Sequence, residues 1–226
     1  LPILELAAIA NESTFDAIIV DEGQDFDPYW LKVLTSLLAD SEQGIYYIFY
    51  DDNQRIYNRD KIPFLWPIYH LTRNMRNTNP VFEHVRRYYH KPDSIRPSGI
   101  DGPQPWIISG FSDEYQVLQD VLARLDAEQV PLQNIAILTP RDKTKSCWGP
   151  NGPRPEKPRS YRLIWNLHPF RGQVSCCTIH SFKGFERPVI ILTELDHLFP
   201  RALEELLYIA TSRAKDHLVV LGNLPA

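Results

Sequence analysis

Two adjacent carboxylates, Asp21 and Glu22, carry the first indication of chemistry in this sequence. They directly follow residues 15–20 (FDAIIV), a short β-branched apolar run that is typical of a buried parallel strand. Ligands bind at the carboxyl ends of strands in open α/β sheets. There, one carboxylate can hold Mg²⁺ through water while its neighbour orients or deprotonates the water that attacks a nucleotide. The alternative is a helix cap, because acids also stabilise the start of a helix.

Strands and helices alternate along the chain and would position these acids. A second apolar run, residues 45–50 (IYYIFY), also ends in acids, Asp51 and Asp52. Further strands are predicted at residues 106–109, 135–138, 189–192 and 218–221, and helices after Asp27, after Asn79, from residue 112 and at residues 203–213. This alternation predicts an α/β fold with a sheet covered by helices on both faces, and the apolar stripes are interpreted as core.

The acid pair belongs to a longer string, residues 20–25 (VDEGQD), which four further blocks follow. These blocks are residues 49–57 (FYDDNQRIY), 71–78 (LTRNMRNT), 178–186 (TIHSFKGFE) and 208–214 (YIATSRA). In this order they resemble motifs II to VI of UvrD/Rep-type superfamily 1 DNA helicases. The resemblance implies a RecA-like (P-loop NTPase type) parallel sheet, an ATP-dependent helicase as the full-length protein, and ATP and Mg²⁺ as cofactors.

The resemblance implies roles for five residues in ATP hydrolysis. Asp21 would serve Mg²⁺ and Glu22 would be the catalytic base. Gln54 would contact the γ-phosphate or the attacking water, and Arg76 and Arg213 would be the two arginines that reach the γ-phosphate. A guanidinium group suits that task because it offers forked donors and a permanent charge. The alternative for both arginines is a surface or ion-paired structural role.

Five more residues would contact the ribose or a nucleic-acid strand. Glu186 would accept a hydrogen bond from the ribose, and Thr178, His180 and Lys183 would lie near the backbone of single-stranded DNA. Tyr57 would stack on a base. The alternatives are a solvated acid for Glu186, a structural hydrogen bond for His180 and a core position for Tyr57.

Three departures from the family pattern concern mainly DNA stacking. Tyr50-Asp51 stands where the family has Gly-Asp, residues 58–60 (NRD) replace a Trp, and Asn74-Met75-Arg76 replaces Asn-Tyr-Arg. These changes leave the residues for phosphate chemistry in place. The interval from residue 78 to residue 178 is also too short for the large accessory domain of longer relatives.

No GxxxxGK[ST] string occurs, so the backbone cradle and lysine for the β- and γ-phosphates are missing from this sequence. In the family that loop precedes motif II. We therefore expect an excised piece with half an ATP site, whose phosphate-binding loop lies in an upstream part of the same polypeptide. Residues 1–66 would end the first RecA-like motor domain and residues 67–226 would form the second, with a boundary near residues 62–67 (IPFLWP).

Composition indicates an ordinary globular protein with 43% hydrophobic residues and a net charge of −4. Residues 141–162 are basic and rich in Pro and Gly, which predicts an exposed loop that could follow nucleic acid. Cys147, Cys176 and Cys177 have no metal-ligand spacing, so no zinc site is predicted. The absence of a membrane span or signal peptide favours a cytoplasmic protein without membrane partners.

Three hypotheses for function remain open at this level. The first is an ATP-driven translocase acting on single-stranded or partly duplex DNA, with RNA as a further substrate class. The second is a non-catalytic nucleic-acid-binding protein, and the third is a motor module fused to a nuclease. In each case the chain by itself is expected to be inactive as an ATPase, because it lacks the phosphate-binding loop.

Overall fold

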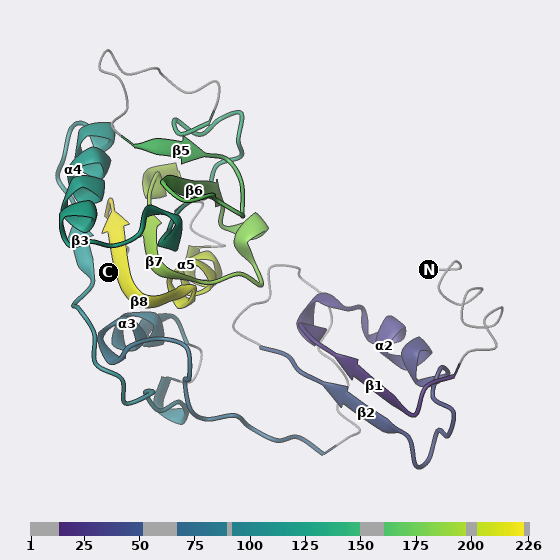
Figure 1. Ribbon diagram of the computed structural model, residues 1–226. Helices are drawn as coiled ribbons and strands as arrows, with labels where there is room; N and C mark the ends of the chain where they lie inside the picture. Colours follow the sequence, from purple (N-terminus) through teal and green to yellow (C-terminus); the bar gives the residue numbers. More distant parts are fainter. Residues whose placement is uncertain (1–13, 52–66, 90–91, 150–160, 198–202, 224–226) are drawn as a thin grey trace. The chain divides into compact units, whose positions relative to one another are not determined.

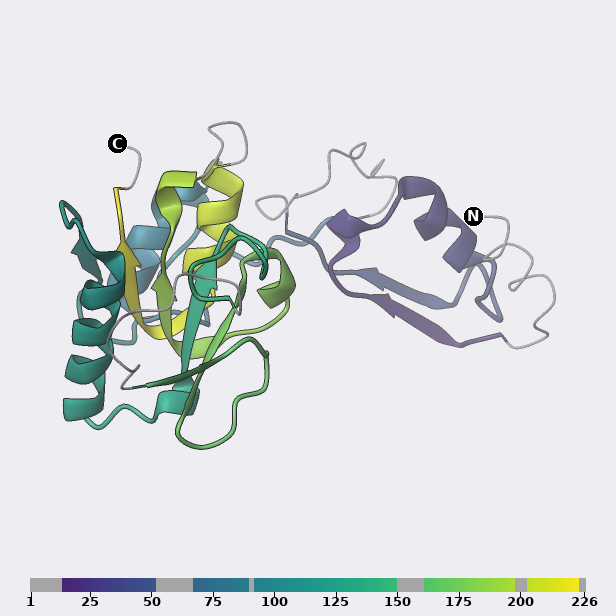
Figure 2. The ribbon, with the colours of Figure 1, turned by 90° about the horizontal axis from the view of Figure 1, so that it is seen from above.

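The computed structural model describes residues 14–51, 67–89, 92–149, 161–197 and 203–223. The chain divides into two compact units, Leu1–Leu71 and Thr72–Ala226, which are described separately here (Figures 1 and 2). The sequence placed a boundary after residue 66. The assignment of the two units to a first and a second motor domain stays a prediction.

In its described residues, unit 1 contains two parallel strands and one α-helix. Strand β1 (Ala17–Val20) pairs with β2 (Ile45–Ile48) in the register Ala17↔Ile45 to Val20↔Ile48. Helix α2 (Pro28–Thr35) begins at Asp27, whose side chain accepts a hydrogen bond from Tyr29 N at 2.9 Å. Both strands are shorter than the predicted runs, but their parallel pairing follows the prediction.

One face of the β1–β2 pair forms the core of unit 1. Val20 and Leu31 are buried there. Six partly buried side chains pack against them: Ile18, Phe26, Leu34, Tyr46, Ile48 and Tyr50. The Tyr46 hydroxyl donates to Leu31 O at 2.7 Å, which ties β2 to α2. Successive side chains of a strand point to opposite faces, so Ile19 and Tyr47 of the same strands are exposed.

Unit 2 is built on a six-stranded parallel sheet with the order β3-β8-β7-β4-β6-β5. Its strands are β3 (Trp106–Ile108), β4 (Ile135–Thr139), β5 (Arg162–Ile164), β6 (Gln173–Thr178), β7 (Arg187–Leu192) and β8 (Ala214–Leu221). The sequence predicted β3, β4, β7 and β8 but missed β5 and β6. Strand β6 (QVSCCT) was missed because Gln and Ser interrupt its apolar pattern.

Helices cover both faces of this sheet. Helix α4 (Glu114–Ala127) lies on one face, and α3 (Asn79–Val85) and α5 (Leu203–Ser212) lie on the other (Figure 2). Short 3₁₀ helices are η1 (Gly23–Asp25) in unit 1 and η3 (Arg86–Tyr88), η4 (Pro92–Ser94), η5 (Leu132–Asn134), η6 (His180–Phe182) and η7 (Leu195–His197) in unit 2. The predicted α/β sheet covered on both faces is confirmed. Within the described ranges, no helix has the length and apolar character that a membrane crossing requires.

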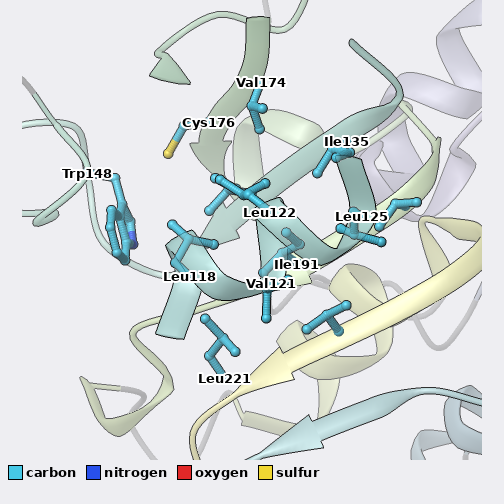
Figure 3. Close-up of a cluster of buried hydrophobic side chains, with 13 residues drawn as sticks. Leu118, Val121, Leu122, Leu125, Ile135, Trp148, Val174, Cys176, Ile191 and Leu221 are labelled. Atoms are coloured by element: carbon cyan, nitrogen blue, oxygen red, sulfur yellow. The ribbon is translucent and has the colours of Figure 1, made fainter. Parts of the chain in front are cut away.

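The core under α4 shows why this helix packs where it does (Figure 3). Its stripe Leu118, Val121, Leu122 and Leu125 contacts alternate residues of the central strands, among them Ile135, Ile137, Val189, Ile191, Val219 and Leu221. Each such side chain contributes roughly 1.5–3 kcal/mol when fully buried. Trp148 joins this cluster and is 3% exposed. The prediction of an exposed loop over residues 141–162 is therefore wrong around residue 148.

Candidate functional site

The acid pair of unit 1 lies at the carboxyl end of β1. Glu22 has a left-handed backbone (φ 51°, ψ 42°), and its N–H donates to Asp21 Oδ1 at 2.9 Å. Gly23 follows, and its N–H donates to Phe49 O at 2.8 Å. A Cβ at Gly23 would lie 2.3 Å from Ile48 Cγ2, so only glycine lets this turn approach the end of β2.

Gln24 fixes the Glu22 carboxylate, a role that the sequence did not suggest. Gln24 is 4% exposed, and its Nε2 donates to Glu22 Oε2. Its Oε1 accepts a hydrogen bond from Asp51 N at 3.0 Å. The amide therefore links the Glu22 carboxylate to the chain just after β2 and fixes its position. The signal that could have found this role is the Gln two residues after Glu22.

The donor set fits a magnesium ion. Asp21 is exposed, so its carboxylate is accessible to a hydrated cation. Among the described residues, no group of three or more His, Cys, Asp and Glu side chains could hold a metal. Mg²⁺ at nucleotide sites is bound by one or two carboxylates together with phosphates and water, so Asp21 alone is compatible with such a site. Gln54 and Tyr57, the other predicted site residues of this region, lie outside the described residues.

In unit 2, three charged side chains meet at the amino ends of β7 and β8. Arg76 Nε donates to Glu186 Oε2 at 3.0 Å, and Lys215 Nζ lies 3.0 Å from Glu186 Oε1. Partial burial would raise the pKa of Glu186, but the hydrogen bond from Lys215 and the charges of Lys215 and Arg76 outweigh it and lower that pKa. Glu186 is thus held ionised between two cations. We refer to these three residues as the charge cluster.

The segment that carries Arg76 is tied to the start of β8. Asn74 Oδ1 accepts hydrogen bonds from Arg76 N at 3.0 Å and from Asn77 N at 2.9 Å. The Asn77 amide is buried and donates to Ser212 O at 3.1 Å and to Ala214 O. These bonds place the backbone of Arg76 beside β8, although the two segments are far apart in the sequence.

Arg213 also lies at the amino ends of β7 and β8, but its side chain is buried. It directly follows α5 and is 2% exposed, and its Nε donates to Ile209 O at 3.1 Å, one helical turn back. Its carbonyl oxygen accepts a hydrogen bond from Arg187 N at 3.1 Å, next to Glu186. The structure therefore brings Arg76, Glu186 and Arg213 to one edge of unit 2. Their roles toward a nucleotide stay predictions.

The predicted nucleic-acid contacts form a second group, at the carboxyl end of β6. Thr178 Oγ1 accepts a hydrogen bond from Ser181 N at 3.0 Å, and Lys183 N donates to His180 O at 3.2 Å, which closes a turn over η6. Partial desolvation lowers the pKa of His180, so its imidazole is neutral at pH 7. Because β6 and β7 both pair with β4 in parallel, Thr178 at the carboxyl end of β6 lies at the opposite end of the strands from Glu186, which precedes β7.

A buried carboxylate organises the neighbouring loop at that second edge. Glu194 has a left-handed backbone (φ 58°) and accepts hydrogen bonds from Thr139 Oγ1 at 2.5 Å and Ser146 Oγ at 2.6 Å. Arg141 Nη1 lies 3.7 Å from Glu194 Oε1. Thr139 pairs in register with Thr178, so Glu194 positions the start of the basic segment beside the second group. The sequence had not indicated this network.

Part of unit 2 is similar in sequence to a known family. Residues 173–221 match the model of the family described as UvrD-like helicase C-terminal domain. This range therefore resembles a UvrD-like helicase C-terminal domain. The matched UvrD-like range runs from β6 through β7 and α5 to β8 and includes Glu186, Arg213 and Lys215. Arg76 lies upstream of it. Among curated proteins, the sequence finds no match.

Solved structures are similar in fold to this chain. The PRRSV helicase superposes with a TM-score of 0.51 and 13% identity, over 97% of this chain and 40% of that one. Arterivirus nonstructural protein 10, a helicase, gives 0.50 and 16%, over 93% and 40%. The C-terminal domain of a possible DNA helicase from Lactobacillus strain WCFS1 gives 0.48 and 18%, over 65% and 86%.

These likenesses concern the fold and not the activity. At 13% and 16% identity, the two viral structures show that the parallel sheet flanked by helices is that of helicase motor domains, which confirms the predicted fold class. The chain spans 40% of the length of each of these two helicases.

Proposed function

We propose that this chain is part of an ATP-driven superfamily 1 helicase or translocase that moves along single-stranded or partly duplex DNA. The observation that carries the proposal is the convergence of Arg76, Glu186 and Arg213 from three separate sequence blocks at one edge of unit 2. Two arginines and an acid suit a nucleoside triphosphate, because guanidinium groups bind phosphate and a carboxylate accepts from ribose hydroxyls. The UvrD-like match over residues 173–221 supports the same family of reactions.

In the proposed reaction, each predicted site residue has its own role. Asp21 would hold a hydrated Mg²⁺, which would supply positive charge to the phosphates. Glu22, held by Gln24, accepts the proton of the attacking water. Arg76 and Arg213 stabilise the charge on the transferring phosphoryl group. An upstream part of the same polypeptide supplies the phosphate-binding loop, which this sequence lacks.

The residues that follow β6 contact the nucleic-acid strand in this proposal. Thr178, His180 and Lys183 offer a hydroxyl, an imidazole N–H and an ammonium to backbone phosphates, and Tyr57 stacks on a base. Phosphate contacts of this kind do not distinguish DNA from RNA, since both strands present the same backbone charge.

The test of catalysis is the ATPase rate of the full-length protein with single-stranded DNA. Replacing Glu22 with glutamine should lower kcat by about 10²–10⁴, the usual contribution of a general base. Glu42→Gln, an exposed acid of the same unit, is the matched control and should leave kcat unchanged. If Glu22→Gln hydrolyses ATP at the parental rate, the non-catalytic alternative replaces this proposal.

The basic segment 141–162 should increase the affinity for the nucleic-acid backbone without a preference for base sequence. Lys143 and Lys145 are exposed, and Arg154 and Arg159 lie outside the described residues. Each phosphate contact adds about −0.7 to the slope of log K against log salt for a single strand. Replacing these four residues with serine in the full-length protein should flatten that slope by roughly 2 to 3 units. An identical salt dependence in mutant and parent would show that the segment is ordinary surface.

A further inference from the structure

Lys215 is part of the charge cluster, although neither the motif comparison nor the family match gives it a role. Lys215 Nζ lies 3.0 Å from Glu186 Oε1, and Arg76 Nε lies 3.0 Å from Glu186 Oε2. Two cations therefore share one carboxylate, and the cluster has an excess of one positive charge. A single carboxylate cannot compensate both cations, so the cluster retains attraction for a further anion.

Backbone hydrogen bonds connect the segments that carry the two cations, Arg76 and Lys215. Thr78 N donates to Lys215 O at 2.8 Å, and Thr78 Oγ1 donates to Asp216 O at 3.0 Å. Asn77, next to Arg76, donates to Ala214 O. Because the segment of Arg76 runs along the first residues of β8, Arg76 and Lys215 keep their spacing without Glu186. Groups that are positioned in advance bind a ligand with less loss of conformational entropy.

The charge cluster is open to solvent. The side chains of Arg76, Glu186 and Lys215 are 39%, 41% and 44% exposed, respectively. Ion pairs with this exposure contribute little to stability because water and salt screen them. A polyphosphate carries several negative charges and can accept from a guanidinium and an ammonium at once. It can therefore replace Glu186 as the partner of both cations.

We propose that Lys215 is a third cationic ligand of the nucleotide's phosphates, and that Glu186 is the counter-ion that holds Arg76 and Lys215 until phosphate replaces it. This inference rests on the proposed function, because it assigns new roles within the same site. Arg187 Nη1 also lies near the cluster, but it donates to Glu186 O at 2.9 Å, and Nη2 donates to Leu167 O at 2.6 Å. Asp216, the next residue of β8, is exposed and adds a negative charge beside Lys215.

The test uses inorganic tripolyphosphate as probe, with the 226-residue chain, by titration calorimetry at low ionic strength. Lys215→Gln should weaken binding by about fivefold to tenfold, and Lys215→Arg should restore it. Arg86→Gln is the matched control, since Arg86 forms a comparable ion pair with Glu83 at 3.1 Å and its side chain is 40% exposed. This control should change the affinity by less than about twofold.

Glu186→Gln separates the counter-ion role from ribose binding. Removing the competing carboxylate should tighten tripolyphosphate binding by about threefold or more, because the probe contains no ribose. ATP should gain less than tripolyphosphate from the same substitution, since it loses the hydrogen bond from its ribose. Tripolyphosphate binding that is unchanged or weaker in Glu186→Gln would refute the counter-ion role.

Further outcomes decide the role of Lys215. Equal affinity of Lys215→Gln and the parent chain, or no binding by the parent chain, would overturn that role. The proposed function fails separately, if the full-length protein does not hydrolyse ATP although the charge cluster binds tripolyphosphate as described. In the full-length protein, Lys215→Gln should raise KM for ATP more than it lowers kcat, as expected for a binding contact.

Discussion

Replacement of Arg213 with alanine in the full-length protein should lower kcat for ATP hydrolysis by about 10³ or more, while nucleotide affinity changes by less than about tenfold. An arginine that reaches the transferring phosphoryl group acts mainly in the transition state, where charge on the equatorial oxygens is greatest. Its loss should therefore appear in kcat. The measurement is steady-state phosphate release at saturating single-stranded DNA, together with nucleotide binding at equilibrium.

Because Arg213 is buried, a second variant is needed to separate a loss of catalysis from a loss of stability. The side chain is 2% exposed and its Nε donates to Ile209 O, so truncation to alanine also removes packing and a hydrogen bond. Arg213→Lys keeps the charge and much of the volume but loses the forked donors. We expect this variant to unfold near the parental temperature and still to show a large loss of kcat. A lysine variant with parental kcat would mean that Arg213 is structural.

The 226-residue chain by itself should show no measurable nucleic-acid-dependent ATPase activity. Asp21 and Glu22 can serve a cation and a water, but in-line transfer requires that the triphosphate be held in place. The sequence contains no GxxxxGK[ST] cradle to do this. The measurement is steady-state phosphate release with single-stranded DNA, compared with the same chain carrying Glu22→Gln.

Phosphate release above that Glu22→Gln control would contradict the expectation and would mean that the chain holds a triphosphate by other groups. Binding of tripolyphosphate to the same preparation provides the folding control. A chain that binds the probe through Arg76 and Lys215 but releases no phosphate has a formed charge cluster and an incomplete catalytic site. A chain that neither binds tripolyphosphate nor releases phosphate would argue against phosphate binding by the charge cluster.

Local sequence was sufficient for most elements of the fold. Residues 135–138 and 218–221 are apolar runs whose burial on both faces follows from a parallel sheet, and Asp27-Pro28 and Asp113 mark helix starts by capping. Strand β6 was missed because its polar residues find partners only in the folded chain. Ser175 Oγ donates to Asn166 O, so a hydroxyl is tolerated inside the sheet.

The segment after β4 shows the reverse error. The lysines, prolines and glycines of residues 141–162 predicted an exposed loop, but Ser146 and Trp148 are buried. Trp148 Nε1 donates to Thr193 Oγ1 at 3.1 Å, and Ser146 donates to Glu194. These partners follow β7 and are distant in sequence. Composition could not reveal them, because the average character of a segment says nothing about a single anchoring side chain.

The sequence by itself determined which residue types are available for phosphate chemistry: Asp21 and Glu22 after a strand, and Arg76, Glu186 and Arg213 in ordered blocks. Only the tertiary structure decided how they are paired. The sharing of Glu186 between Arg76 and Lys215 depends on the register of β7 against β8 and on the attachment of residues 74–78 to β8. The Arg76–Glu186 pair and the attachment to β8 join residues more than a hundred positions apart, and local sequence does not determine the geometry of such long-range contacts.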